Sequence, residues 1–253
     1  MKRLAVSIMA LGLFLALTIP AMAHFGMIIP SNSILPQGQK SLDLTLSFSH
    51  PFEGHGMDLV KPKMFKVFHD GKSQDLLGTL KETKVMGHKS WMTTYSPKRP
   101  GMYIFAMEPQ AYPEPAEDNY IIHYTKTVVS AYDEGEDWNT PVGLKTEIVP
   151  LTRPWGNYAG NVFQGIVLMD GKPAPYTRVE VEYYNAAGQF TAPSDCMVTQ
   201  EVLCDGNGVF TVALPLPGWW GFAGLNDADY KIEGKDVELG AVLWIELKPF
   251  TTK

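Results

Sequence analysis

In LDLTLSF, residues 42–48, every second side chain is apolar. Because successive side chains of a β-strand point to opposite faces, this alternation predicts a strand with one face packed and the other in water. The same reasoning predicts strands at residues 64–69, 91–95, 102–107 and 120–131. No stretch keeps apolar residues at helical spacing. The first half of the chain is therefore predicted to form one β-sandwich.

In the second half of the chain, apolar residues again recur at every second position, and the turns between the runs are clearer. The turn sequences DGKP and DGNG separate apolar runs that predict further strands at residues 162–168, 178–184, 209–214 and 237–247. In the strand at 178–184 we expect Glu180 and Glu182 to face outward. The order of strands and turns is similar to that of transthyretin-like or carboxypeptidase-regulatory-like modules. The sequence thus predicts a mainly β protein of two sandwiches, immunoglobulin-like or transthyretin-like.

Two proline-rich segments interrupt the predicted strands. Residues 108–118 contain three prolines, which remove backbone donors, so this segment is expected to be a loop. Residues 133–161 contain three prolines and several glycines, a composition typical of a junction between domains. We therefore predict a first domain at residues 24–154 and a second at residues 155–253.

The first 23 residues have the composition of an export signal. Lys2 and Arg3 precede an apolar run at 4–20, and AMA at 21–23 follows as a cleavage site. A retained membrane anchor is the alternative, although the run is short for a span of about 20 residues. No later segment is long and apolar enough to cross a bilayer. We therefore expect cleavage after Ala23 and a soluble periplasmic protein without membrane insertion.

The chain is acidic and has none of the common catalytic motifs. It carries 21 Lys and Arg against 27 Asp and Glu, and loss of Lys2 and Arg3 with the signal changes the net charge from −6 to −8. Nucleic-acid binding needs a clustered basic surface, so no nucleic-acid partner is expected. The sequence also lacks a nucleophile elbow, a P-loop, a dinucleotide-binding glycine motif and a zinc-protease motif. We therefore expect a binding protein and not an enzyme.

The two cysteines, Cys196 and Cys204, lie eight positions apart. In an exported protein, oxidising conditions favour a disulfide between them, which would staple a hairpin. Metal binding by the two thiolates is the alternative, but two cysteines without a second pair or a nearby histidine are a weak indication of a metal site.

The six histidines all lie in the first half of the chain that would remain after cleavage. His24 would become the first residue, and its α-amine and ring Nδ1 could then chelate one metal ion. Imidazole and amine nitrogens suit Ni, Co, Cu and Zn better than Ca or Mg. The alternative is that the cleavage site simply precedes a histidine.

A second group of candidate ligands follows the first predicted strand. The sequence SHPFEGHGMD, residues 49–58, combines His50 and His55 with two carboxylates in a glycine-containing loop. An ordinary polar turn is the alternative. His123 lies within a predicted strand, where a histidine is either a hydrogen-bonded core residue or a rigidly placed ligand. His88 precedes another strand and could join the same site.

Four blocks of the sequence resemble a known family. They are AHFGMIIP at 23–30, HPFEGHGM at 50–57, YSPKRPG at 95–101 and EIVPLTRPWG at 147–156. Together they are similar to a domain-of-unknown-function family of exported bacterial proteins, described as the periplasmic component of ABC-type cobalt or nickel transport systems. The resemblance implies a periplasmic protein that binds Ni(II) or Co(II) and works with a metal transporter in the membrane. His24, His50 and His55 lie within the matching blocks.

These observations lead to one main hypothesis and two alternatives. The main hypothesis is a periplasmic protein that binds one divalent ion, Ni or Co with Cu or Zn possible, through His24, His50 and His55, joined by His123 or His88. The first alternative is a copper carrier or a histidine-brace copper oxidase. The second is a structural or adhesive β-sandwich protein, in which the histidines would lie more than about 10 Å apart, too far to share one ion.

Overall fold

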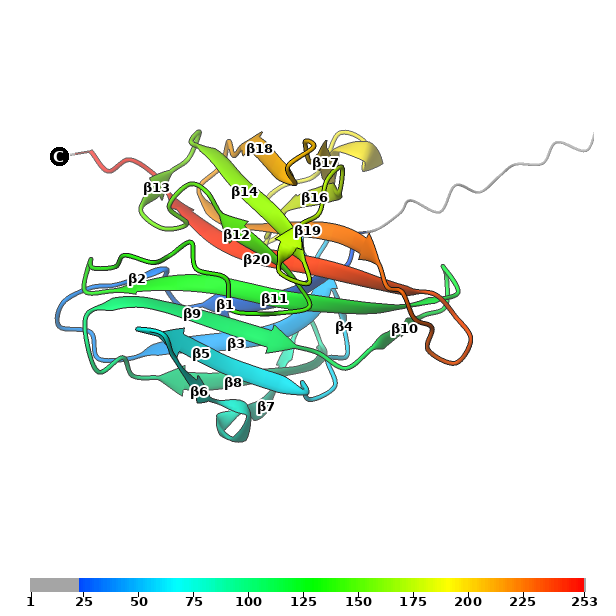
Figure 1. Cartoon of the computed structure of the whole chain (residues 1–253). Coiled ribbons are helices and arrows are strands. Elements are labelled where there is room, and N and C mark those ends of the chain that lie inside the picture. Colours follow the sequence, from blue (N-terminus) through cyan, green and yellow to red (C-terminus); the bar gives the residue numbers. More distant parts are fainter. Residues whose placement is uncertain (1–22, 253) are drawn as a thin grey trace, which may run out of the picture.

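The computed structural model describes residues 23–252, and the chain folds there almost entirely into β-strands (Figure 1). The strands of the first half are β1 (Phe25–Pro30), β2 (Ile34–Leu35), β3 (Leu42–His50), β4 (His55–Met57), β5 (Met64–His69), β6 (Lys72–Asp75), β7 (Lys81–Val85), β8 (His88–Tyr95), β9 (Gly101–Glu108), β10 (Tyr112–Glu114) and β11 (Asn119–Ala131). Those of the second half are β12 (Thr146–Pro150), β13 (Asn157–Tyr158), β14 (Val162–Met169), β15 (Lys172–Pro173), β16 (Arg178–Tyr183), β17 (Gln200–Leu203), β18 (Val209–Ala213), β19 (Gly218–Asp227) and β20 (Val237–Lys248). Two short 3-10 helices, η1 (Leu77–Thr79) and η2 (Asp195–Met197), lie between strands.

The strands form three sheets. The first sheet has the order β1-β3-β8-β7, with β4 paired to β3. The central sheet has eleven strands. Eight of them follow the order β17-β16-β19-β20-β11-β9-β5-β6, and β2 and β10 pair with β11 while β13 pairs with β20. The third sheet has the order β12-β14-β15, with β18 paired to β14. The mainly β, sandwich-like architecture predicted from the sequence is confirmed.

The core of the first half lies between the first sheet and the central sheet. The alternating apolar residues of β3 are all buried, and they pack with Tyr103 and Phe105 of β9. The period of two in residues 42–48 therefore predicted the packed face of this strand correctly.

The central sheet is covered on both faces. On β20, Val242 and Trp244 pack with Phe25 of β1, whereas Leu243 and Ile245 pack into the cluster that contains residues of the third sheet. A strand buried on both faces needs apolar side chains in both directions, which explains the nearly continuous apolar run of β20.

The two halves of the chain share this central sheet. β20 pairs in parallel with β11, from Tyr120 opposite Val237 to Thr127 opposite Trp244. Hydrogen-bonded strands therefore continue from the first half into the second, a connection that the sequence pattern did not indicate. The boundary predicted at residues 154 and 155 falls between β12 and β13 and stays a prediction.

Two local predictions were wrong. The proline-rich segment 108–118 was expected to be a loop, but it contains β10, which pairs with β11. A proline is tolerated there because β10 is a short edge strand. Glu182 was expected to face water, but it is only 1% exposed. The turn between β3 and β4 covers this face of β16, and the Phe52 N–H donates a hydrogen bond to the Glu182 carboxylate.

The predicted disulfide does not form in the described part of the chain. Both thiols are free, with Cys196 exposed in η2 and Cys204 buried in a hydrophobic core. The two side chains lie in different environments and do not meet. Burial raises the pKa of the Cys204 thiol to about 11, so this thiol stays protonated at neutral pH.

The predicted signal peptide, residues 1–23, lies outside the described residues except for Ala23. Ala23 is buried in a small cluster with Phe25, Met27 and residues of β19 and β20. In the part of the chain that the structure describes, we find no helix with the length and apolar character needed to span a membrane.

Candidate metal centre

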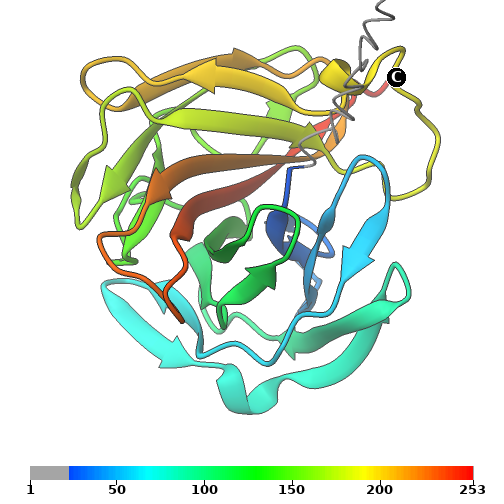
Figure 2. The same cartoon turned by 90° about the vertical axis from the view of Figure 1, so that its right-hand side faces the viewer.

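The candidate site lies at one end of the first sandwich, where the start of β1, the end of β3, β4 and β10 meet. Figure 2 looks onto this end of the molecule, with the short green strand β10 near the centre and the blue β1 and β3–β4 hairpin beside it. β1 and β3 are antiparallel, with Phe25 opposite Ser49. One position further along this register brings His24 opposite His50.

The imidazole rings of His24 and His50 contact each other. Their centroids are 4.6 Å apart, and the rings are nearly perpendicular at 87°. Opposed residues on neighbouring antiparallel strands place their Cβ atoms about 5 Å apart on one face of the sheet. The strand pairing thus joins two histidines that are 26 positions apart in the sequence.

Glu114 of β10 determines which nitrogen of His24 is available. Its Oε2 lies 2.8 Å from Nε2 of His24, and both side chains are largely buried. At this separation, the carboxylate favours a proton on Nε2, which leaves the lone pair of the neutral ring on Nδ1. Nδ1 is the nitrogen that can chelate together with an N-terminal amine.

Both histidines are held in the neutral form. Burial lowers the pKa of His24, and His123 lowers it further, against the opposing charge of Glu114. Burial, followed by the neighbouring His24 and His55, lowers the pKa of His50 to about 4. Neutral imidazole is the form that binds a metal ion.

His50 is the most unusual residue of this group. Its two ring nitrogens are buried and have no hydrogen-bond partner among residues 23–252. Buried polar atoms are nearly always satisfied, so an imidazole with two unused nitrogens calls for an explanation such as an ion. The ring of His50 fits the chemistry of a nitrogen ligand.

Two further donors approach His50 from the β3–β4 hairpin. His55 is paired with His50 across the two strands, and Glu53 lies in the connecting turn. One ligand atom from each of His50, Glu53 and His55 can be chosen so that all three lie within 4.8 Å of one another. His50 therefore lies between His24 on one side and these two residues on the other.

The remaining two predicted ligands are placed differently. The Gly26 N–H donates to Nδ1 of His123 at 3.3 Å, so the proton of the neutral ring is on Nε2, which faces Glu238 at 3.4 Å. Both nitrogens of His123 are thereby engaged. His88 is half exposed, with its Nδ1 3.3 Å from Asp58. The structure thus places His24 against His50 and His50 near His55, and gives His123 and His88 other partners.

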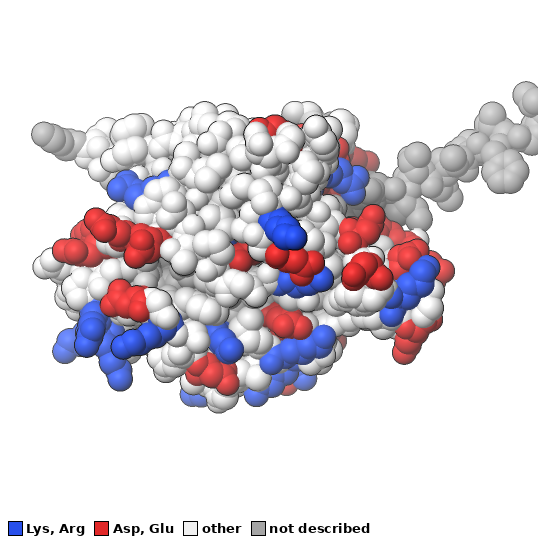
Figure 3. Space-filling view, viewed as in Figure 1, with Lys and Arg blue, Asp and Glu red and all other residues white. Residues whose placement is uncertain are grey.

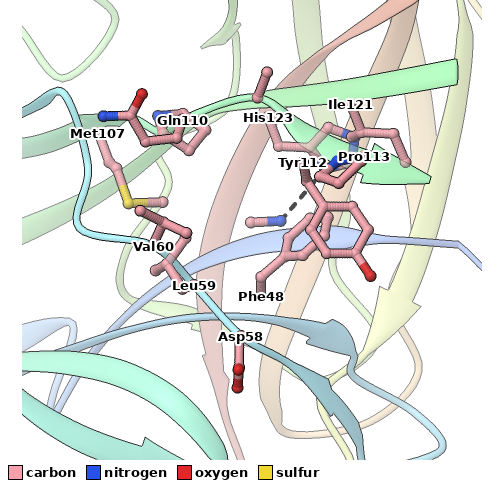
Figure 4. Close-up of a pocket in the computed structure, with 13 residues that line it drawn as sticks. Phe48, Asp58, Leu59, Val60, Met107, Gln110, Tyr112, Pro113, Ile121 and His123 are labelled. Carbon is pink, nitrogen blue, oxygen red and sulfur yellow. Dashed lines mark hydrogen bonds between the residues drawn. The ribbon is translucent and has the colours of Figure 1, made fainter.

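An apolar cavity of about 50 Å³ adjoins the site (Figure 4). Phe48, Tyr112 and His123 lie on its walls, and the ring of Phe48 stacks on His24 with centroids 5.6 Å apart. This apolar wall excludes water from one side of the histidine pair. Low polarity strengthens electrostatic interactions at the site.

Two carboxylates lie among the donors, because Glu114 contacts His24 and Glu53 lies near His50 and His55. In Figure 3 several acidic side chains, with basic ones between them, lie at the right-hand end of the molecule, the end where Figure 1 shows β10. Imidazole nitrogens together with carboxylate oxygens suit divalent ions of the Ni, Co, Cu and Zn group. The sequence indicated the histidines and the carboxylate of Glu53, but it missed Glu114. The only signal for Glu114 was a carboxylate between prolines, in a segment expected to be an irregular loop.

Comparison with known proteins identifies the family but not a function. No curated protein matches the sequence. Among solved structures, the D0–D1 domains of intimin align over 87% of this chain and 99% of their own at 12% identity and a TM-score of 0.27. A candidate carbohydrate-binding protein from Bacteroides uniformis aligns over 85% and 97% at 15% identity and a TM-score of 0.26. A tandem of titin immunoglobulin domains aligns over 90% and 100% at 9% identity and a TM-score of 0.22.

At such low TM-scores, these likenesses say nothing about the function of the chain. The sequence profile of the domain of unknown function DUF4198 matches residues 21–227, which include every residue of the candidate metal centre. The resemblance to a domain-of-unknown-function family is therefore confirmed: the chain belongs to the DUF4198 family.

Proposed function

We propose that this protein binds one divalent transition-metal ion through His24, His50 and His55, with Glu53 as an oxygen donor. The observation that carries the proposal is His50, a buried, neutral imidazole without a hydrogen-bond partner among the described residues, between two other histidines. The spacing also supports it, because the rings of His24 and His50 lie much closer than the 10 Å or more expected of unrelated histidines.

Each residue has a separate part in this proposal. His24 would bind through Nδ1, joined by its α-amine if the signal is cleaved after Ala23. Glu114 would hold the proton on the other nitrogen of this ring. His50 and His55 would add two imidazoles from the β3–β4 hairpin. Phe48 would cover one side of the ligands and keep water away.

The choice of metal and the biological role are proposed from the family resemblance. The ion would be Ni(II) or Co(II), and the protein would carry it in the periplasm to a transporter in the membrane. Both ions are bound well by imidazole nitrogen. The resemblance covers the blocks that contain His24, His50 and His55.

Calorimetric titration of the processed protein with Ni(II), Co(II), Cu(II) and Zn(II) tests the proposal. We expect a 1:1 complex with a dissociation constant well below about 100 μM, which corresponds to a binding free energy of about −5.5 kcal/mol. A His50→Ala variant should lose most of this affinity, and His69→Ala, at a histidine on the far end of β5, should keep it. Absence of binding tighter than about 100 μM for every ion would overturn the proposal.

A copper protein is the second candidate. The perpendicular pair of imidazoles, one of them on the residue that cleavage would make N-terminal, favours a histidine brace. Tight Cu(II) binding alone does not distinguish the two candidates, because any nitrogen site prefers Cu(II) over Ni(II) and Co(II). Redox turnover of the copper-loaded protein with a polysaccharide would establish the oxidase, whereas copper bound without turnover would indicate a carrier.

A further inference from the structure

Side chains from the second half of the chain hold the tip of the β3–β4 hairpin. The Phe52 N–H donates to Oε2 of Glu182 at 3.3 Å. The side-chain amide of Asn185 donates to the Phe52 carbonyl at 3.1 Å, and the Asn185 N–H donates to the Pro51 carbonyl at 3.2 Å. In Figure 2 the yellow segment of the second half lies beside the tip of this blue hairpin.

The two anchoring side chains are themselves fixed. The other carboxylate oxygen of Glu182 accepts a hydrogen bond from the Thr199 hydroxyl. The side-chain oxygen of Asn185 accepts from the backbone N–H groups of Gln189 and Phe190. Both residues are buried, with 1% of Glu182 and 7% of Asn185 exposed. Because other residues hold these two side chains in place, their hydrogen bonds to Pro51 and Phe52 also hold the backbone of the hairpin in place.

The anchored residues lie directly beside the proposed ligands. Pro51 follows His50, and Phe52 precedes Glu53. The ring of His50 has no hydrogen bond of its own among the described residues, so apart from its contact with the ring of His24 its position depends on the backbone of the hairpin. Metal ligands need such external support, because the ion accepts only a narrow range of donor positions.

We propose that Glu182 and Asn185 are positioning residues of the metal centre, which fix the β3–β4 hairpin so that His50, Glu53 and His55 converge. This inference rests on the proposed metal binding. It makes the second half of the chain part of the scaffold of a site whose ligands all come from the first half.

The burial of Glu182 agrees with this assignment. Burial, with Glu180 and Glu53 nearby, raises the pKa of this carboxyl to about 8, against hydrogen bonds from Thr199 and Phe52. A buried carboxyl group lowers the stability of the fold unless its contacts offset the loss of hydration. The contacts of Glu182 in the structure are with Thr199 and with the hairpin tip.

The test compares variants of the processed protein in Co(II) titrations, followed by the visible absorption spectrum of the ion. Asn185→Ala and Glu182→Ala should each weaken Co(II) binding by about 10- to 100-fold and change the spectrum. Glu182→Gln should restore binding, because the amide oxygen can still accept from the Phe52 N–H. Asn185→Asp keeps the shape of the side chain but cannot donate to the Phe52 carbonyl, so it should bind as weakly as Asn185→Ala.

Ser33→Ala is the matched control. The Ser33 hydroxyl donates to Glu246 at 2.8 Å and forms another polar contact between the two halves, away from the hairpin. This variant should keep wild-type affinity and spectrum. Hydrogen exchange of the metal-free proteins gives a second measurement: residues 50–57 should exchange faster in Asn185→Ala but not in Ser33→Ala.

The outcomes separate the two proposals. Wild-type protein that binds Co(II), with variants of unchanged affinity, spectrum and exchange, overturns the positioning role alone. Wild-type protein that binds none of the divalent ions overturns both. If Glu182→Ala does not fold, the pair Asn185→Asp and Glu182→Gln decides, and equal Co(II) affinity in these two variants contradicts the inference.

Discussion

His50 shows what burial does to a single ionisable side chain. Its ring nitrogens have no hydrogen-bond partner among the described residues, and burial lowers its pKa from the usual 6.5 to about 4. The folded protein therefore keeps a neutral imidazole throughout the physiological pH range. A buried imidazole without hydrogen bonds lowers the stability of the fold, unless its nitrogens bind a ligand such as a metal ion.

The lowered pKa of His50 predicts a loss of stability in acid. Between pH 6.5 and about 4, the unfolded chain binds a proton at His50 and the folded metal-free protein does not, so the free energy of unfolding falls as the pH decreases through this range. The expected contribution is about 2 kcal/mol. Urea unfolding from pH 7.5 to 4 should show a smaller decrease for His50→Asn than for the wild type. Equal slopes for both proteins would contradict the prediction.

Glu114 gives a second prediction at this scale. If its carboxylate keeps the proton on Nε2 of His24, Glu114→Gln should weaken metal binding by about tenfold, because a neutral amide no longer favours that protonation state. Glu117→Gln is the control, because it removes the same charge from an exposed residue nearby. Calorimetry with Ni(II) measures both. Equal affinity of the two variants would show that the contact with His24 has no role in binding.

At the scale of elements, β1 is the strand that connects the candidate site to the core. It pairs with β3 and packs over β11, so His24, the residue directly before it, is placed by contacts on two sides. Gly26 makes this close approach possible. A Cβ added there would lie 2.4 Å from the Thr125 hydroxyl and 3.1 Å from Cβ of His123.

Gly26→Ala should therefore move β1 away from β11. We expect the free energy of unfolding to fall by about 2 kcal/mol, the usual cost of overpacking, together with weaker metal binding because His24 is displaced. Gly78→Ala is the control, since a Cβ there meets nothing within 4 Å. Thermal unfolding of both variants is the measurement. A Gly26→Ala protein as stable as Gly78→Ala would show that the two strands can separate without cost.

At the scale of the whole molecule, a buried ion pair joins the central sheet to the third sheet. Lys126 of β11 lies 2.6 Å from Glu147 of β12, and each side chain is only 1% exposed. Glu147 also accepts from the backbone N–H groups of Val142 and Gly143, so the pair fixes the segment that leads into the third sheet. Burial lowers the pKa of Lys126, against the neighbouring carboxylate, so its charge depends on this partner.

Removal of one partner should be costly for this pair. Glu147→Ala leaves a buried ammonium group without its carboxylate, and we expect a loss of about 3 to 5 kcal/mol in the free energy of unfolding. The double variant Lys126→Met with Glu147→Leu should recover part of that loss, because neither charge remains buried. Urea unfolding at pH 7 measures both. A Glu147→Ala protein within about 1 kcal/mol of the wild type would rule out this role of the pair.

The sequence determined the features that depend on neighbouring residues. The period of two in residues 42–48 predicted the packed face of β3, and the turns of the second half bounded its strands, because both patterns are set by local backbone geometry. The candidate ligands His24, His50 and His55 were also visible as residue types beside a predicted cleavage site and in a turn.

Only the tertiary structure decided which distant segments meet. The register of β1 against β3 placed His24 opposite His50, and the tip of the β3–β4 hairpin covered a face of β16 that was expected to be wet. Glu182 is therefore buried against this hairpin, and Glu114 reaches His24 because β10 pairs with β11 at the same end of the molecule. Side-chain alternation states which way a residue points, but the burial and partner of that residue depend on strands far away in the chain.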